Sequence, residues 1–134
     1  MPKTYLLIAA LSGFIAVALG AFGAHGLRDK LSADLLAVYQ TGVQYQFYHT
    51  FALLAVGLLL MLSTPSLSSA VIPPQVTWLK WSGNLFAIGI VIFSGSLYVL
   101  ALSGVRWLGA ITPLGGLAFL AGWISLAVAA WHWK

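Results

Sequence analysis

The sequence predicts an all-α membrane protein, a bundle of four transmembrane helices. Three observations lead to this prediction. Of the 134 residues, 61% are apolar and only 6% are charged, and the mean hydropathy is +1.00, whereas about a quarter of a soluble domain is charged. A soluble fold of 14.3 kDa could not hide this much apolar surface. The apolar residues also form four charge-free segments, each close to the roughly 20 residues that cross a hydrocarbon core.

The four predicted spans cover about residues 5–23, 43–62, 82–102 and 113–131 of a single integral membrane domain, residues 1–134. Charged residues lie outside these windows, as expected when a charge inside the bilayer costs a few kcal/mol or more. An even number of spans places both termini on one face. Lysine and arginine mark the cytoplasmic face, but they leave the orientation open because each face has three: Lys3, Lys80 and Lys134 with the termini, and Arg28, Lys30 and Arg106 opposite.

The first segment, residues 5–23, is predicted to be a span that packs closely against another helix. Lys3 before it and small residues after it also fit a secretory signal, although the apolar run is long for one. Small side chains recur at spacings of three or four, at Ala9, Gly13, Ala16, Gly20 and Ala24. Such residues let helix backbones approach in lipid, within one chain or between two copies.

The end of this first span carries two candidate functional residues, His25 and Arg28. Gly26 is expected to end the helix in a left-handed conformation. His25 would then lie near the unpaired carbonyls of the helix end, which favour a cation. The alternative is that His25 and Arg28 together bind an anion or a lipid head group, or handle a proton.

The second helix is expected to begin well before its membrane span. Ser32 can cap a helix that starts at Ala33, with Asp34 in its first turn. No proline interrupts residues 33–62. The sequence therefore predicts an amphipathic extension of this helix ahead of the span.

Polar side chains gather on one side of the second helix. At 100° per residue they occupy successive positions, while Val43, Phe47, Leu54 and Leu58 fall on another side that we expect to face lipid. The polar set is Gln40, Thr41, Gln44, Tyr45, Tyr48 and His49. Unpaired polar groups in a bilayer cost several kcal/mol, so we expect this side to face the protein. The candidate partners are Asn84, Ser94, Ser96, Tyr98 and Thr112. These groups either fix one helix packing or form a ligand or proton site.

His49 in particular is expected to lie inside the bundle. Burial opposes the charged imidazolium, and both aspartates belong to the first loop. A neutral ring both donates and accepts, so it can link two helices. The expected partner is a hydroxyl or an amide from another span.

The remaining connections complete an antiparallel pair of spans. Residues 63–77 are rich in proline, serine and threonine and are predicted to form a loop, whereas residues 103–107 form a tight connection. Thr112 is expected to cap the fourth span, with Pro113 at its first position. Tryptophans mark the membrane boundary on the face of the termini, and these are Trp78, Trp81, Trp131 and Trp133.

The composition argues against several classes of function. Cysteine is absent, and the three histidines have no carboxylate or thiol within the spans, so we expect no metal and no cofactor. Haem ligation by His25 or His49 is the one cofactor alternative. No Ser-His-Asp arrangement or nucleotide-binding fingerprint occurs, so we expect no enzyme. The six cations are scattered, and we expect no nucleic-acid partner.

Several short motifs occur in a fixed order along the chain. They are Gly20–Leu27, Tyr39-Gln40-Thr41, Tyr45-Gln46 with His49, Phe93–Tyr98, Ile111–Gly116 and Gly122-Trp123. On these motifs the chain resembles, over essentially its whole length, the bacterial inner-membrane proteins grouped as domain-of-unknown-function family 423, which are related to eukaryotic transmembrane protein 256. The resemblance implies a small multi-pass protein of the bacterial cytoplasmic membrane. It brings no established activity, so it identifies no catalytic residue.

Small-residue faces and short loops lead us to expect a non-enzymatic accessory, assembly or interaction factor. Its partners would be the lipid bilayer and other membrane proteins or a second copy of itself. The alternative is a small transporter, a channel or a lipid- or quinone-binding protein that uses the polar side of the second helix. An enzyme that acts on lipid would require a substrate or turnover to support it.

Overall fold

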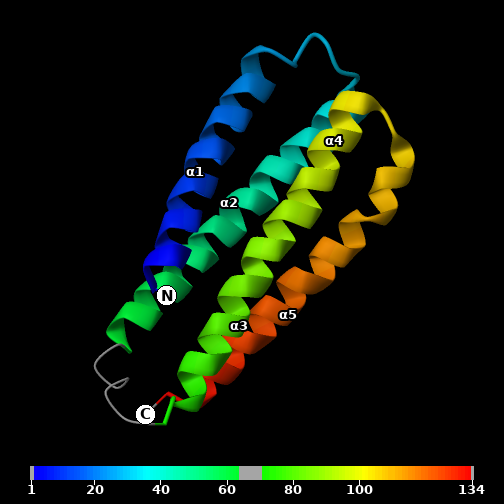
Figure 1. Ribbon diagram of the computed structural model, residues 1–134. Coiled ribbons are helices and arrows are strands. Elements are labelled where there is room, and N and C mark those ends of the chain that lie inside the picture. The colour runs from blue at the N-terminus through cyan, green and yellow to red at the C-terminus, as the bar shows by residue number, and fades with distance from the viewer. Residues whose placement is uncertain (1, 64–70, 134) are drawn as a thin grey trace.

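The computed structural model describes residues 2–63 and 71–133, and this part of the chain contains helices and no strand (Figure 1). The elements are α1 (Pro2–His25), α2 (Ala33–Leu62), α3 (Pro74–Gly89), the π-helix η2 (Ile90–Ser94), α4 (Gly95–Ser103), the 3-10 helix η3 (Arg106–Ala110) and α5 (Thr112–Trp131). Helices α3, η2 and α4 follow one another without a break and form one rod. Four rods are long and apolar enough to cross a membrane, which confirms the predicted fold class.

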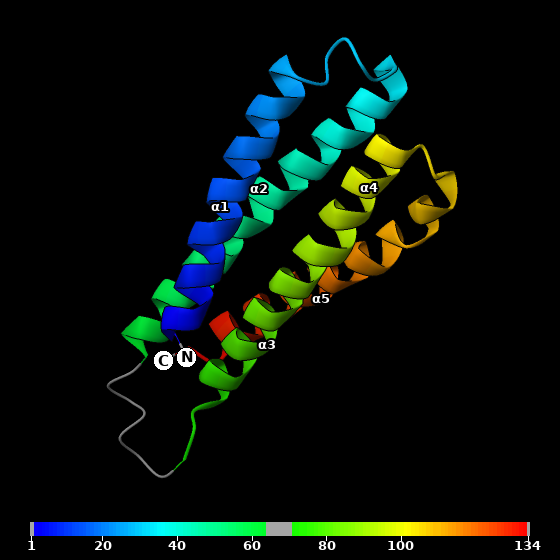
Figure 2. The ribbon, with the colours of Figure 1, turned by 45° about the horizontal axis from the view of Figure 1, so that its top comes forward.

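The four rods are arranged as two antiparallel helix pairs. Helix α1 packs mainly against α2, and α3 packs mainly against α5. Helix α2 joins the two pairs, because it also contacts α3, η2 and α4 (Figure 2). Helix α1 begins and α5 ends at the same end of the bundle, as an even number of spans requires (Figure 1).

Helix α2 begins where the sequence predicts, at Ala33. The Ser32 hydroxyl accepts a hydrogen bond from the Leu35 backbone N–H at 3.3 Å, so the cap and the extension ahead of the span are confirmed. The prediction for Gly26 is wrong. Its N–H continues the helix by donating to the Phe22 carbonyl at 2.7 Å, and the one positive φ among the described residues is that of Gly104, 71°, which ends α4.

The third rod is longer at its start than the predicted span, since α3 begins at Pro74, directly after the N-cap Pro73. Residues 64–70 of the predicted loop over residues 63–77 lie outside the described residues, and residues 74–77 belong to α3 and not to a loop. The connection over residues 103–107 is less tight than predicted, because the chain turns at Gly104 and then forms η3 before α5 begins.

Small residues bring α1 close to α2, as predicted. Ala9 and Ala16 are almost fully buried in this contact. The prediction that Val43 faces lipid is wrong, because Val43 is half-buried and its side chain lies against Gly20. Overpacking costs about 1 to 3 kcal/mol in proteins. A side chain larger than valine at position 43 is therefore expected to lower the stability of the bundle.

The topology can be tested by thiol labelling, because the chain contains no cysteine. Ala33 begins α2, whereas Ile72 lies just before α3 at the other end of the bundle, and both positions are exposed. An impermeant maleimide added to intact cells is expected to label one of the variants Ala33→Cys and Ile72→Cys and not the other. Equal labelling of the two variants from outside would contradict the four-span topology.

Candidate functional site

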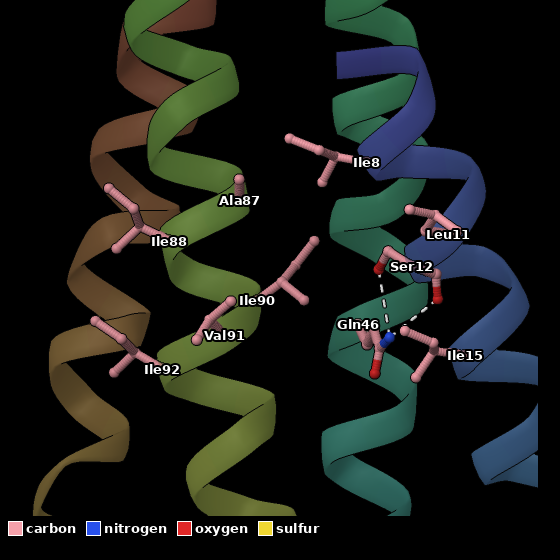
Figure 3. A pocket seen from close by; sticks show the side chains of 10 residues that line it. All are labelled: Ile8, Leu11, Ser12, Ile15, Gln46, Ala87, Ile88, Ile90, Val91 and Ile92. Atoms are coloured by element: carbon pink, nitrogen blue, oxygen red, sulfur yellow. Dashed lines mark hydrogen bonds between the residues drawn. The ribbon is translucent and has the colours of Figure 1, made fainter. Parts of the chain in front are cut away.

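A network of buried polar side chains ties together α1, α2 and α4. The Gln46 amide donates from Nε2 to the Ser12 carbonyl oxygen at 3.0 Å and to the Ser12 hydroxyl at 3.3 Å (Figure 3). The Tyr98 hydroxyl donates to Gln46 Oε1 at 2.6 Å. The Ser12 and Thr50 hydroxyls are 2.6 Å apart. Gln46 is only 4% exposed, and its amide is satisfied from both sides within the bundle.

The other side chains predicted to bond to the polar side of α2 differ in their partners. The Ser94 hydroxyl donates to the Gly42 carbonyl at 2.7 Å, so it meets α2 as expected. The Ser96 and Thr112 hydroxyls are 2.7 Å apart and join α4 to α5 instead. Thr112 therefore does not cap α5 with its side chain, contrary to the prediction.

Asn84 also bonds outside α2, because its Oδ1 accepts from the Tyr5 hydroxyl of α1 at 3.0 Å.

His49 lies inside the bundle and is 5% exposed. The Trp123 indole N–H donates to His49 Nε2 at 3.2 Å, so Nε2 carries no proton, since an indole only donates. His49 Nδ1 is 2.8 Å from the Tyr45 carbonyl oxygen and is therefore the protonated nitrogen of a neutral ring. The ring links α2 to α5, but its partner is an indole, and the prediction of a hydroxyl or an amide is wrong.

The predicted polar side of α2 does not face the interior as a whole. Gln40 and Gln44 are exposed, Tyr48 is 52% exposed and Tyr45 is 38% exposed. The buried side is centred on Gly42, Gln46, His49, Thr50 and Leu53, which is roughly 130° around the helix from the predicted side at about 100° per residue. Of the predicted set, only His49 is fully on the interior side.

Sequence reasoning missed Ser12, Gln46 and Thr50, which form the polar network with Tyr98. One signal could have located the buried side of α2. Gly42 and Gly57 mark where a neighbouring helix comes close, since an added Cβ would press on Tyr98 at 2.9 Å and on Leu6 at 2.7 Å, respectively. Gln46 and Thr50 lie on the same side as these glycines.

Gln44 and Tyr48 both lie within the candidate membrane span Ala33–Leu62 and within the predicted span, residues 43–62. A Cβ on Gly42 would lie 3.4 Å from the Leu97 Cβ, and Leu97 precedes the end of α4 at Ser103 by six residues, or about 9 Å. Gln44 and Tyr48 are further along α2 and therefore further from that end of the bundle. Neither side chain forms a hydrogen bond with any residue that the structure describes.

His25 and Arg28 lie at the opposite end of the bundle from the termini, where both are exposed. His25 is the last residue of α1, and Arg28 belongs to the connection that follows. No hydrogen bond or ion pair joins the two side chains within residues 2–63 and 71–133. The same residues bring together no group of three His, Asp or Glu side chains that could hold a metal ion.

Among the grooves on the sides of the bundle, one borders the polar network and another borders His49, and the volumes of both are in the range typical of ligand sites. The first, of about 520 Å³, lies between α1 and the α3 rod, with aliphatic walls that include Ile8, Leu11 and Ile90 and with Gln46 and Ser12 at its floor (Figure 3). The second, of about 580 Å³, lies between α2 and α5 and is lined mainly by aromatic rings, among them Tyr45, His49 and Trp123.

Comparison with known proteins places the chain among proteins of one family. A family model described as a protein of unknown function, DUF423, matches residues 19–116. The chain is 44% identical over 131 residues to the UPF0382 inner membrane protein YgdD of Escherichia coli, which covers 97% of this chain and 92% of that protein. It is 44% identical over 128 residues to the UPF0382 membrane protein YwdK of Bacillus subtilis, with 96% of each chain covered.

A UPF0382 membrane protein of Staphylococcus epidermidis is 45% identical over 127 residues, which are 95% of this chain and 94% of the relative. No solved structure matches the chain. The family match, the relatives and the four spans agree with the predicted resemblance. The chain belongs to the DUF423 family, and it is a multi-pass protein of the bacterial cytoplasmic membrane.

Proposed function

We propose that this protein is a non-enzymatic interaction factor that binds a transmembrane helix of another membrane protein, or a second copy of itself, along the outward face of α2. One observation carries the proposal. Gln44 and Tyr48 face outward within the second predicted membrane span, and they have no hydrogen-bond partner among the described residues. A polar group left unpaired there costs several kcal/mol, and a neighbouring helix that satisfies it recovers part of that cost.

The surface beside these two residues suits a helix. A shallow groove of about 550 Å³ runs between α1 and α2, and small residues of α1, including Gly20, Gly23 and Ala24, form one side of it. Gln40 and Gln44 form the other side. Small residues allow close backbone approach and amide side chains hydrogen-bond across helices, which is the combination typical of helix pairs in membranes.

The buried polar groups of the bundle support this proposal over a channel or a transporter. The amide of Gln46 and the hydroxyls of Ser12, Thr50, Ser94 and Tyr98 all bond to protein atoms. These bonds fix one arrangement of the helices. The polar groups that remain available for binding are those on the outside.

Site-specific crosslinking tests the proposal. A benzoylphenylalanine residue at position 44, irradiated in native membranes, is expected to give a discrete adduct with one partner or with a second copy. The matched control is position 124 on α5, where Ile124 is 65% exposed and faces lipid. The adduct formed from position 48 is expected to be lost in a Gln44→Leu background. Equal adducts from positions 44 and 124, or none from position 44, would contradict the proposal.

A further inference from the structure

The groove between α2 and α5 differs in its walls from the other grooves. Five of its nine lining residues carry a planar aromatic ring, and these are Tyr45, His49, Phe93, Phe119 and Trp123. The groove opens along the candidate membrane spans, because Tyr45 belongs to the span Ala33–Leu62 and Trp123 to the span Arg106–Trp131. A compound dissolved in the membrane therefore reaches the groove from the side.

The rings of this groove support one another. The centroids of Tyr45 and Phe93 are 4.7 Å apart, and those of Phe93 and Phe119 are 5.4 Å apart. His49 stacks on Phe119 with a centroid distance of 3.4 Å and an interplanar angle of 6°. Two hydrogen bonds hold the His49 ring in place. Its Nε2 accepts from the Trp123 indole N–H, and its Nδ1 donates to the Tyr45 carbonyl oxygen. The wall is thus formed before any ligand arrives, which lowers the entropic cost of binding.

A π-helix gives the third rod its shape at this wall. Phe93 belongs to η2 (Ile90–Ser94), where the extra residue in the turn interrupts the α-helical pattern. Such segments are rare and occur frequently at functional sites. Here η2 presents Phe93 to the groove while Ser94 bonds to α2. This irregularity is an observation independent of the ring contacts.

The groove offers one polar group that the fold leaves available. Tyr45 is 38% exposed, and its hydroxyl bonds to no residue within the described part of the chain. Both ring nitrogens of His49 are occupied. A ligand seated among the rings would meet a single hydroxyl donor at its edge.

We propose that this groove binds the head group of a lipid-soluble quinone. The flat ring stacks against the aromatic wall, one quinone carbonyl accepts a hydrogen bond from the Tyr45 hydroxyl, and the apolar tail leaves past Leu117 and Leu120 into the bilayer. An acyl chain has neither a flat face nor an acceptor to match these features. The aliphatic groove between α1 and α3 has the walls that suit such a chain better.

Fluorescence titration tests this assignment. The full-length protein in lipid nanodiscs is titrated with decylubiquinone, and tryptophan quenching is corrected for that of a membrane-embedded tryptophan peptide. Saturable quenching at one quinone per chain is expected, with Trp123 as the reporter. Tyr45→Phe is expected to raise the Kd about threefold to tenfold, the effect of one neutral hydrogen bond. Quenching that rises in proportion to quinone without saturation would overturn the proposal.

Two glycine variants separate occupancy of the groove from general damage. Gly116→Leu places a side chain into the groove, and a Cβ there would lie no closer than 3.9 Å to Phe93. It is expected to abolish saturable quenching. Gly95→Leu adds the same side chain where no atom lies within 4 Å of the Cβ, away from the groove, and is expected to leave the Kd unchanged. Unchanged binding in Gly116→Leu or in Tyr45→Phe overturns the proposal, and neither result bears on the outward face of α2.

Discussion

Replacing Gly115 with alanine is expected to destabilise the bundle by about 1 to 3 kcal/mol, the usual cost of overpacking. Gly115 lies where α5 crosses η2. A Cβ at this position would collide with the Phe93 backbone nitrogen and lie only 2.7 Å from the Phe93 Cα. Backbone atoms of a packed helix cannot move aside as the end of a side chain can. Helices α5 and η2 must therefore separate, which also disturbs the Phe93–Phe119 contact.

The neighbouring glycine provides the matched control. A Cβ on Gly116 would approach Phe93 no closer than 3.9 Å, an ordinary contact. Gly116→Ala is expected to be neutral or to stabilise by up to about 1 kcal/mol, because alanine is the better helix former. Thermal unfolding of both variants in the same detergent, followed by circular dichroism, gives the comparison. Equal midpoints for Gly115→Ala and Gly116→Ala would show that α5 and η2 do not approach as closely as described.

The features that depend on local chemistry could be predicted from the sequence. The four spans follow from charge-free apolar segments of bilayer length, and the start of α2 follows from a capping serine at Ser32. The end of α1 could not be predicted in the same way. Gly26 permits a left-handed residue but does not require one, and the chain adopts that conformation at Gly104.

The polar side chains of α2 could not predict its rotation, in contrast to Gly42 and Gly57, and the reason is physical. In a soluble protein the polar side of a helix identifies the outside, but in a membrane both sides are apolar and polar residues occur on either. The six polar residues predicted to share one side of α2 lie across the boundary between its buried side and its exposed side. His49 is buried, whereas Gln44 and Tyr48 are exposed. Only the positions of α1 and α4 decide which side is covered. The π-helix η2 likewise depends on how Phe93 and Ser94 pack, and no local sequence signal marks it.

Replacing Gln46 with leucine is expected to destabilise the bundle by about 1 to 3 kcal/mol. The leucine has a similar size, but it removes the acceptor of the Tyr98 hydroxyl and the donor to Ser12. The Tyr98 hydroxyl then loses its hydrogen-bond acceptor while it stays in a half-buried site. The cost is the full desolvation of that group, which exceeds the net gain of an ordinary hydrogen bond.

A double-mutant cycle tests this explanation. Adding Tyr98→Phe to Gln46→Leu removes the stranded hydroxyl, so the double variant is expected to be more stable than Gln46→Leu alone. Gln44→Leu is the control for loss of an amide from α2, because Gln44 is exposed and bonds to no described residue. Its unfolding midpoint is expected to be no lower than that of the unaltered chain, since the substitution removes an amide that has no partner. Urea unfolding in mixed micelles is measured for the unaltered chain, Gln46→Leu, Tyr98→Phe, the double variant and the control Gln44→Leu. If Gln44→Leu and Gln46→Leu lose the same stability, the amide of Gln46 does not tie α1 and α4 to α2, and the polar network is not what fixes the helix packing.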